Sequence, residues 1–129
     1  MTVVIGYIPN VYGEAALTAG IEEARRRQTG VLVVNASKGD SLADPKYVGE
    51  SAWADLGDRL GDLEIPHDVR QTIGSDVADE LIDAVREVDA EVVVIGIRHR
   101  TAVGKMLMGS VAQRVLLEAP CPVIAVKPD

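Results

Sequence analysis

The chain has 129 residues, 47% of them hydrophobic, which predicts a globular domain with a buried core and excludes a disordered chain. Its formal net charge of −7 argues against a nucleic-acid or anionic-membrane partner, because binding to either requires basic patches. A single cysteine excludes an internal disulfide framework, and no apolar run is long enough for a membrane span. We therefore expect a soluble, cytoplasmic protein.

Five short runs have the composition of strands, and four amphipathic stretches lie between them. The strand patterns cover residues 3–8, 31–36, 67–73, 91–96 and 122–127. The helix patterns cover residues 13–28, 51–63, 76–88 and 110–118. Three of the strand runs are almost continuously aliphatic, as expected of strands covered on both faces, whereas the mixed run at 67–73 suits an edge strand. The alternation predicts one doubly wound α/β domain over residues 1–129, with a parallel sheet.

In a doubly wound sheet, ligands bind beyond the carboxyl ends of the strands. The turn after the first strand, YIPNVYG, lacks the GxGxxG fingerprint of dinucleotide-binding domains. The segment HRTAVGKM matches the phosphate-loop pattern GxxxxGK[ST] at Gly104 and Lys105 but fails it at His99 and Met106. No group of His, Cys, Asp or Glu has metal-ligand spacing, so the sequence predicts no metal.

The start of the last helix is the better candidate for an anion site. Ser110 and Gln113 fit an S-x-x-Q capping box, and the N–H groups of a first helical turn favour an anion. Arg98, Arg100 and Lys105 add positive charge in the preceding loop. The rival interpretation is a capped helix after a solvated basic loop that holds no ligand.

The segment VVVIGIRHRTAVGKMLMGSVAQRVLLEAPCPVIAVKP closely resembles the C-terminal signature of the universal stress protein family. That signature is a glycine, two residues, a glycine, nine residues and Gly-Ser. Gly96, Gly109 and Ser110 fall in register, and His99 replaces the second glycine. Gly96 ends the fourth strand, where a glycine would let a ligand approach the backbone closely. The resemblance is strong over residues 91–127 and weaker before them.

The resemblance implies a Rossmann-like sheet in the order 3-2-1-4-5, of the adenine nucleotide alpha hydrolase type, with helices on both faces. It implies a homodimer formed through the last strand, between Pro122 and Lys127, and an uncovered apolar edge there independently favours pairing with a second copy. It also implies two branches, one of which binds ATP or a related adenine nucleotide. The predicted nucleotide site comprises Ile8, Pro9, Asn10, Ala36, Gly96, Arg98, His99, Arg100, Gly109, Ser110 and Val111.

Two departures from the family pattern bear on the nucleotide. Histidine at position 99 tolerates a positive φ better than most non-glycine residues do, and its imidazole is a potential phosphate contact. Ile8 matches the aspartate that usually ends the first strand of the binding branch, which leaves Asn10 as the polar side chain of that turn. Both departures weaken the case for ATP, and the basic residues Arg98 and Arg100 offset them.

Three functions remain in competition at this point. The first is a cytoplasmic stress-response regulator that binds an adenine nucleotide, ATP first, without a required metal and with at most slow, incidental hydrolysis. The second is a dimeric interaction module of the same fold that binds no nucleotide. The third, and the weakest, is a phosphotransfer enzyme, for which Asp40, Asp44 and Asp76 are the candidate acids.

Overall fold

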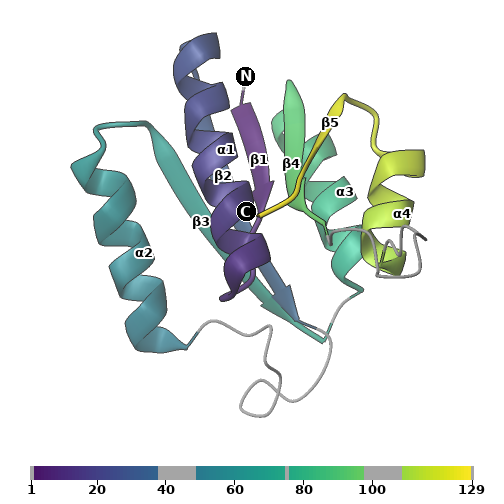
Figure 1. The fold of residues 1–129 in the computed structure, drawn as a ribbon, viewed down its shortest axis with the longest axis horizontal. Coiled ribbons are helices and arrows are strands. Elements are labelled where there is room, and N and C mark those ends of the chain that lie inside the picture. The colour runs from purple at the N-terminus through teal and green to yellow at the C-terminus, as the bar shows by residue number, and fades with distance from the viewer. Residues whose placement is uncertain (1, 38–48, 75, 98–108, 129) are drawn as a thin grey trace.

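The computed structural model describes residues 2–37, 49–74, 76–97 and 109–128. This part of the chain forms a parallel sheet and flanking helices (Figure 1). The strands are β1 (Thr2–Gly6), β2 (Gly30–Ser37), β3 (His67–Ile73), β4 (Val92–Gly96) and β5 (Val123–Val126). The helices are α1 (Val11–Arg27), α2 (Glu50–Asp62), α3 (Val77–Val88) and α4 (Ser110–Glu118). All nine predicted elements are therefore confirmed, with shifts of a few residues at some ends.

The strand order is β3-β2-β1-β4-β5, which confirms the order that the resemblance implied. β1 lies in the middle, with Val4 paired to Leu32 of β2 on one side and to Val93 of β4 on the other. The chain moves outward from β1 to β2 and β3, and then crosses back to β4. This reversal makes the carboxyl ends of β1 and β4 the topological switch point, where sheets of this kind bind ligands.

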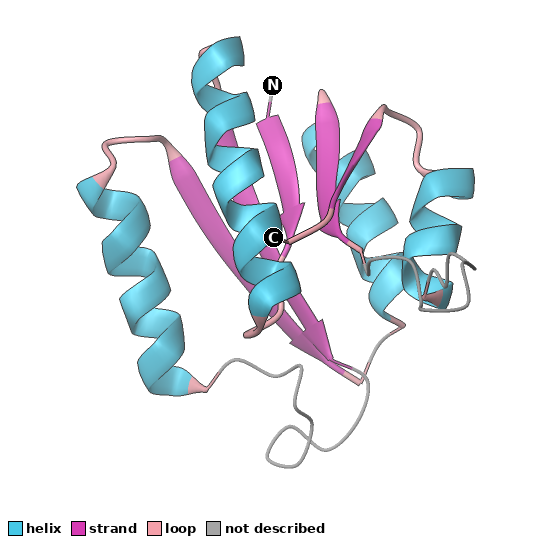
Figure 2. Cartoon of the chain, viewed as in Figure 1, coloured by secondary structure: helices cyan, strands magenta, loops and turns pink. Residues whose placement is uncertain are grey.

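Helices cover both faces of the sheet, which explains the aliphatic strand runs (Figure 2). On one face, Val3 and Ile5 of β1 pack in a cluster with residues of α1 and α2 such as Leu17 and Leu60. On the other face, Val4 packs in a cluster with residues of α3 and α4. The central strands are consequently buried on both sides, as a doubly wound fold requires.

The turn between β1 and α1 lies two residues earlier in the chain than the sequence pattern predicted. β1 ends at Gly6 instead of residue 8, and α1 begins at Val11 instead of residue 13. Asn10 explains the early start, because its side-chain oxygen accepts hydrogen bonds from the backbone N–H groups of Tyr12 at 2.9 Å and Gly13 at 3.1 Å. An asparagine before a helix is a strong start signal, and the helix begins directly after it.

The two edges of the sheet differ in character. β3 is one edge, and its ends at His67 and Ile73 are exposed, as the mixed sequence of this run predicted. β5 is the other edge, and Ile124 lies opposite Val94 in its pairing with β4. β5 is short and apolar, and none of the other described strands pairs with its outer side.

Candidate functional site

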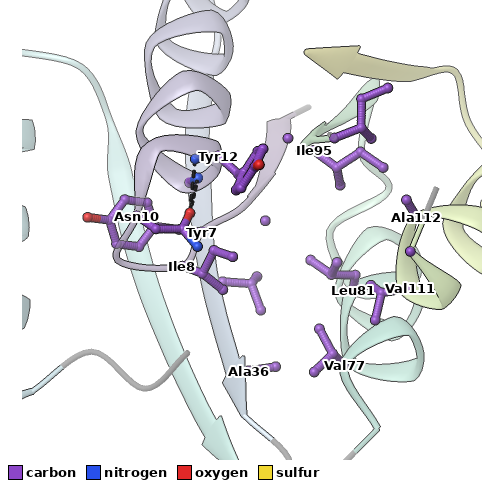
Figure 3. Close-up of a pocket in the computed structure, with 16 residues that line it drawn as sticks. Tyr7, Ile8, Asn10, Tyr12, Ala36, Val77, Leu81, Ile95, Val111 and Ala112 are labelled. Atoms are coloured by element: carbon purple, nitrogen blue, oxygen red, sulfur yellow. Dashed lines mark hydrogen bonds between the residues drawn. The ribbon is translucent and has the colours of Figure 1, made fainter. Parts of the chain in front are cut away.

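A cavity of about 230 Å³ opens at the switch point, just below the usual range for small-molecule pockets. It lies between the carboxyl ends of the central strands and the first turns of α3 and α4 (Figure 3). The turn between β1 and α1 forms its remaining side. The lining residues are Gly6, Tyr7, Ile8, Asn10, Tyr12, Gly13, Val34, Ala36, Val77, Leu81, Ile95, Gly96, Ile97, Gly109, Val111 and Ala112. The cavity therefore occupies the place where the topology predicts a ligand.

One end of the cavity is apolar. Figure 3 shows Ala36, at the end of β2, opposite Val77 in the first turn of α3. Ile8 and Leu81 extend this surface toward the middle of the cavity. The side chains at this end are uncharged, and none of them is polar.

Ile8 is held over the cavity by the tight turn that follows it. Its carbonyl oxygen accepts a hydrogen bond from the backbone N–H of Asn10 at 2.8 Å. The same carbonyl lies against Gly13, where any Cβ would overlap it, so the turn requires glycine at that position. Asn10 lines the cavity, although its side-chain oxygen is occupied by the start of α1. Pro9 is exposed and lies outside the cavity lining.

Gly96 lines the cavity, but the close contact that requires glycine there is internal. A Cβ on Gly96 would overlap the backbone carbonyl group of Tyr12 in the first turn of α1. The sequence pattern suggested that this glycine serves the close approach of a ligand. The structure shows that it also serves the packing of α1 against the end of β4, and the close approach of a ligand stays a prediction.

The start of α4 presents a correction. Gly109, and not Ser110, is the N-cap residue, and no side chain among the described residues caps this helix. The predicted capping box between Ser110 and Gln113 is therefore wrong: Ser110 is already the first helical residue, and Gln113 uses its backbone N–H to bond the carbonyl of Gly109 at 3.0 Å. Gly109 and Ser110 are exposed, and Val111 turns toward the cavity.

The three helix starts that border the cavity are not equivalent. Asn10 caps α1, and Asp76 caps α3 by accepting a hydrogen bond from the backbone N–H of Asp79 at 3.1 Å. α4 has no such cap within the described chain. Backbone N–H groups at an uncapped helix start, together with the helix dipole, attract an anion. Among the three helix starts, α4 is therefore the one whose N–H groups no described side chain occupies.

A buried asparagine supports the turn that follows β1. Asn35 is fully buried, donates a hydrogen bond to the carbonyl of Tyr7 at 2.9 Å, and accepts one from Gln71 at 2.9 Å. Sequence reasoning missed this network. A polar residue inside the otherwise apolar run VLVVNA is the signal that could have revealed it, because a buried amide needs partners.

The phenol of Tyr7 joins a second polar group on the α1 and α2 side. It donates a hydrogen bond of 2.6 Å to Glu14, which also pairs with Arg59 at 2.9 Å. Burial, together with the neighbouring Glu14 carboxylate, raises the pKa of Tyr7 to about 12. The hydrogen bond from Arg59 lowers the pKa of Glu14 below its ordinary value. These contacts connect α1, α2 and the end of β1.

Several predicted site residues lie outside the described residues. Arg98, His99 and Arg100 belong to this group, and so do Asp40 and Asp44 of the phosphotransfer hypothesis. The other predicted site residues cluster around the cavity: Ile8, Asn10, Ala36, Gly96, Gly109 and Val111 line it, Ser110 adjoins it, and Pro9 is set back from it.

Metal-binding clusters and membrane-spanning helices are both absent from the described residues. No group of three or more His, Cys, Asp or Glu side chains in this part of the chain is arranged to hold a metal ion. Within the same residues, none of the helices combines the length and the apolar character needed to cross a membrane.

The fold and the cavity define a doubly wound α/β domain with a candidate ligand site at its switch point. A model of the universal stress protein family matches residues 1–127, and the chain belongs to this family. A universal stress protein of Mycolicibacterium smegmatis is 50% identical over 126 residues, which span 98% of this chain and 97% of that protein.

Solved structures agree with this assignment. A universal stress protein from Archaeoglobus fulgidus is 29% identical, with a TM-score of 0.74 and coverage of 98% of each chain. A universal stress protein from the same organism, solved in complex with dAMP, is 26% identical, with a TM-score of 0.68 and the same coverage. These likenesses extend over the whole α/β unit.

Proposed function

We propose that this universal stress protein binds an adenine nucleotide, ATP first, in the cavity beside β1 and β4. The observation that carries the proposal is the contrast between the capped starts of α1 and α3 and the start of α4, which no described side chain caps. The cavity therefore has one end that favours an anionic group, at the start of α4. Its other end is the apolar surface near Ala36. A nucleotide has both of these parts.

The proposed pose follows from this polarity. The base would lie near Ala36 and Ile8, and the phosphates would meet the backbone of Gly109, Ser110 and Val111. Asn10 would face the sugar with the part of its amide that the α1 cap does not use, beside Pro9 at the rim. The relative solved with dAMP supports an adenine nucleotide as the ligand class. The loop residues Arg98, His99 and Arg100 are proposed to add charge at the phosphates, and Gly96 to supply backbone beneath the sugar.

We further propose a binding protein instead of an enzyme. The described lining offers mainly apolar side chains, backbone groups and glycines. Such a lining can hold a ligand and orient it, but general acid–base catalysis needs a positioned titratable group. Slow, incidental ATP hydrolysis is compatible with this role. We place the protein in the cytoplasm as one nucleotide-responsive regulatory domain.

A homodimer through β5 is proposed as the working assembly. β5 is an edge strand with Ala125 exposed, and an edge strand presents unpaired N–H and C=O groups to a second copy. Leu116 and Leu117 add exposed apolar surface on α4. The same features favour the second candidate function, a dimeric interaction module that binds no nucleotide.

One experiment separates the two candidates. Purified protein is denatured and the released nucleotide is identified, and ligand-free protein is then titrated with ATP, AMP and cyclic AMP by calorimetry. We expect an adenine nucleotide to be released or to bind below millimolar concentration. Absence of both, from protein whose circular dichroism shows it folded, would refute nucleotide binding and leave the interaction module.

A further inference from the structure

Arg114, in the second turn of α4, contacts three carboxylates at once. Its guanidinium lies 2.9 Å from Asp76, 2.6 Å from Asp79 and 3.1 Å from Glu118. The contact with Glu118 lies within α4, whereas the other two reach across to the first turn of α3. One cation thus offsets part of the negative charge of two carboxylates at the start of the neighbouring helix.

Those two carboxylates are not part of the cavity lining, but they belong to the helix start that borders it. Asp76 is the N-cap of α3 and directly precedes Val77, which lines the cavity. Arg114 follows one turn after Val111, which lines the cavity on the same side as Val77. Figure 3 shows the first turns of the two helices facing the same space. The favoured anion position at the start of α4 therefore lies close to acidic side chains.

The ion pairs of Arg114 affect the electrostatic potential near the cavity more than they affect the stability of the fold. The side chains of Arg114, Asp76 and Asp79 are 37%, 40% and 57% exposed, and exposed ion pairs contribute little to the free energy of unfolding. Electrostatic repulsion between a carboxylate and a bound polyphosphate, however, acts over the Debye length of about 10 Å at 0.1 M salt. Loss of the positive charge of Arg114 would therefore make the region around Asp76 and Asp79 more repulsive to an anionic ligand.

We propose that Arg114 is a positioning residue for the phosphate end of the ligand, which acts through Asp76 and Asp79 without touching the nucleotide. It offsets part of the negative charge of the two carboxylates and holds the start of α4 against the first turn of α3. This inference rests on the proposed nucleotide site. It predicts that the contribution of Arg114 grows with the negative charge of the ligand.

The test is the affinity of wild type and Arg114→Gln for adenosine, AMP and ATP, measured by calorimetry at low and high salt. We expect Arg114→Gln to lower the affinity for ATP roughly 3- to 10-fold at about 0.01 M salt. The affinity for AMP should fall less, and the affinity for adenosine should stay unchanged. The loss for ATP should shrink at about 1 M salt, where the Debye length is about 3 Å. The double variant Arg114→Gln/Asp79→Asn should recover part of the ATP affinity.

Arg26→Gln is the matched control. Arg26 lies at the far end of α1 and pairs with Glu23 at 2.7 Å, so its loss removes the same charge from the molecule away from the cavity. Equal losses for adenosine and ATP, or equal effects of Arg26→Gln and Arg114→Gln, would overturn the inference and leave the nucleotide site intact. A wild-type protein that binds none of the three ligands would refute the proposed function itself, and with it the inference.

Discussion

The backbone of Gly96, at the end of β4, lies directly against the backbone of Tyr12, in the first turn of α1. A Cβ at position 96 would overlap the Tyr12 carbonyl group. Because both partners are backbone, neither can move aside as a flexible side chain would. This contact seats the N-terminal end of α1 on the sheet, and it leads to the first prediction.

Gly96→Ala should destabilise the protein by about 1–3 kcal/mol or more, because overpacking a fixed contact forces the backbone to shift. Chemical denaturation followed by circular dichroism measures this loss. Gly109→Ala is the matched control: Gly109 has a φ of −65°, and a Cβ added there would meet no atom of the described residues within 4 Å. The free energy of unfolding of the control should change by less than about 1 kcal/mol. Equal losses in the two variants would contradict the contact described at Gly96.

Gly109→Val should abolish the proposed nucleotide binding and leave the fold and the proposed dimer intact. The added side chain meets open space among the described residues, so it can obstruct a ligand without disturbing the core. Calorimetric titration with ATP gives the affinity, and analytical ultracentrifugation gives the oligomeric state. If Gly109→Val binds ATP as tightly as the wild type, the phosphates do not lie at the start of α4.

Asn10→Ala should lower the free energy of unfolding by about 1 kcal/mol, because the N–H groups of Tyr12 and Gly13 lose their partner. Asn10→Ser is the control, since serine also caps helices. Thermal denaturation should rank the wild type and Asn10→Ser above Asn10→Ala. A stability of Asn10→Ala equal to that of Asn10→Ser would show that the cap contributes nothing.

Asn35→Ala should lower the free energy of unfolding by about 2–4 kcal/mol, because it removes the side chain that both the amide of Gln71 and the carbonyl of Tyr7 contact. The effects of Asn35→Ala and Gln71→Ala should be less than additive in the double variant. Denaturation of the four proteins gives the coupling free energy. Simple additivity would mean that the two amides act independently.

The pKa of Tyr7 predicts a change of stability at high pH. Its folded-state pKa is raised to about 12 from the ordinary value of 10.0, so the folded state holds the phenol proton more tightly than the unfolded state does. The resulting stabilisation is fully present below pH 10.0 and is lost as the pH rises toward about 12. Denaturation of wild type and Tyr7→Phe across this range measures the difference.

Glu14 gives stability a pH dependence of the opposite sign, at low pH. Its pKa is lowered chiefly by Arg59, so its contribution is present above the ordinary value of 4.5 and is lost as the pH falls through the lowered value. Glu14→Gln should therefore reduce stability at neutral pH, and the difference from the wild type should shrink in acid. A constant difference over this range would contradict the contact with Arg59.

The elements and the strand order were predictable because they depend on patterns several residues long. Strands such as VVVIG are aliphatic throughout, and the Gly96, Gly109 and Ser110 spacing carried the family resemblance and, through it, the sheet order. The helix start at Asn10 was missed, although asparagine was a local signal for it. The sequence patterns of individual strands and helices thus locate the ends of the elements around the candidate site to within a few residues.

Interactions between distant segments were not predictable in the same way. The ion pair of Arg114 with Asp76 joins residues 38 positions apart, and the bond from Gln71 to Asn35 spans 36 positions. The capping box at Ser110 failed because the chain enters α4 with Gly109 in the extended conformation that an N-cap residue adopts. The sequence motif allowed either residue to cap, and the backbone path decided between them.

The contact between Gly96 and Tyr12 also changes how related sequences should be compared. A glycine aligned with Gly96 is needed to seat α1, so we expect natural selection to retain it in a relative whether or not that relative binds a nucleotide. The described residues place no such internal constraint on Gly109. Loss of glycine at position 109, with Gly96 kept, is therefore the substitution that marks a lineage in which the site has changed its use.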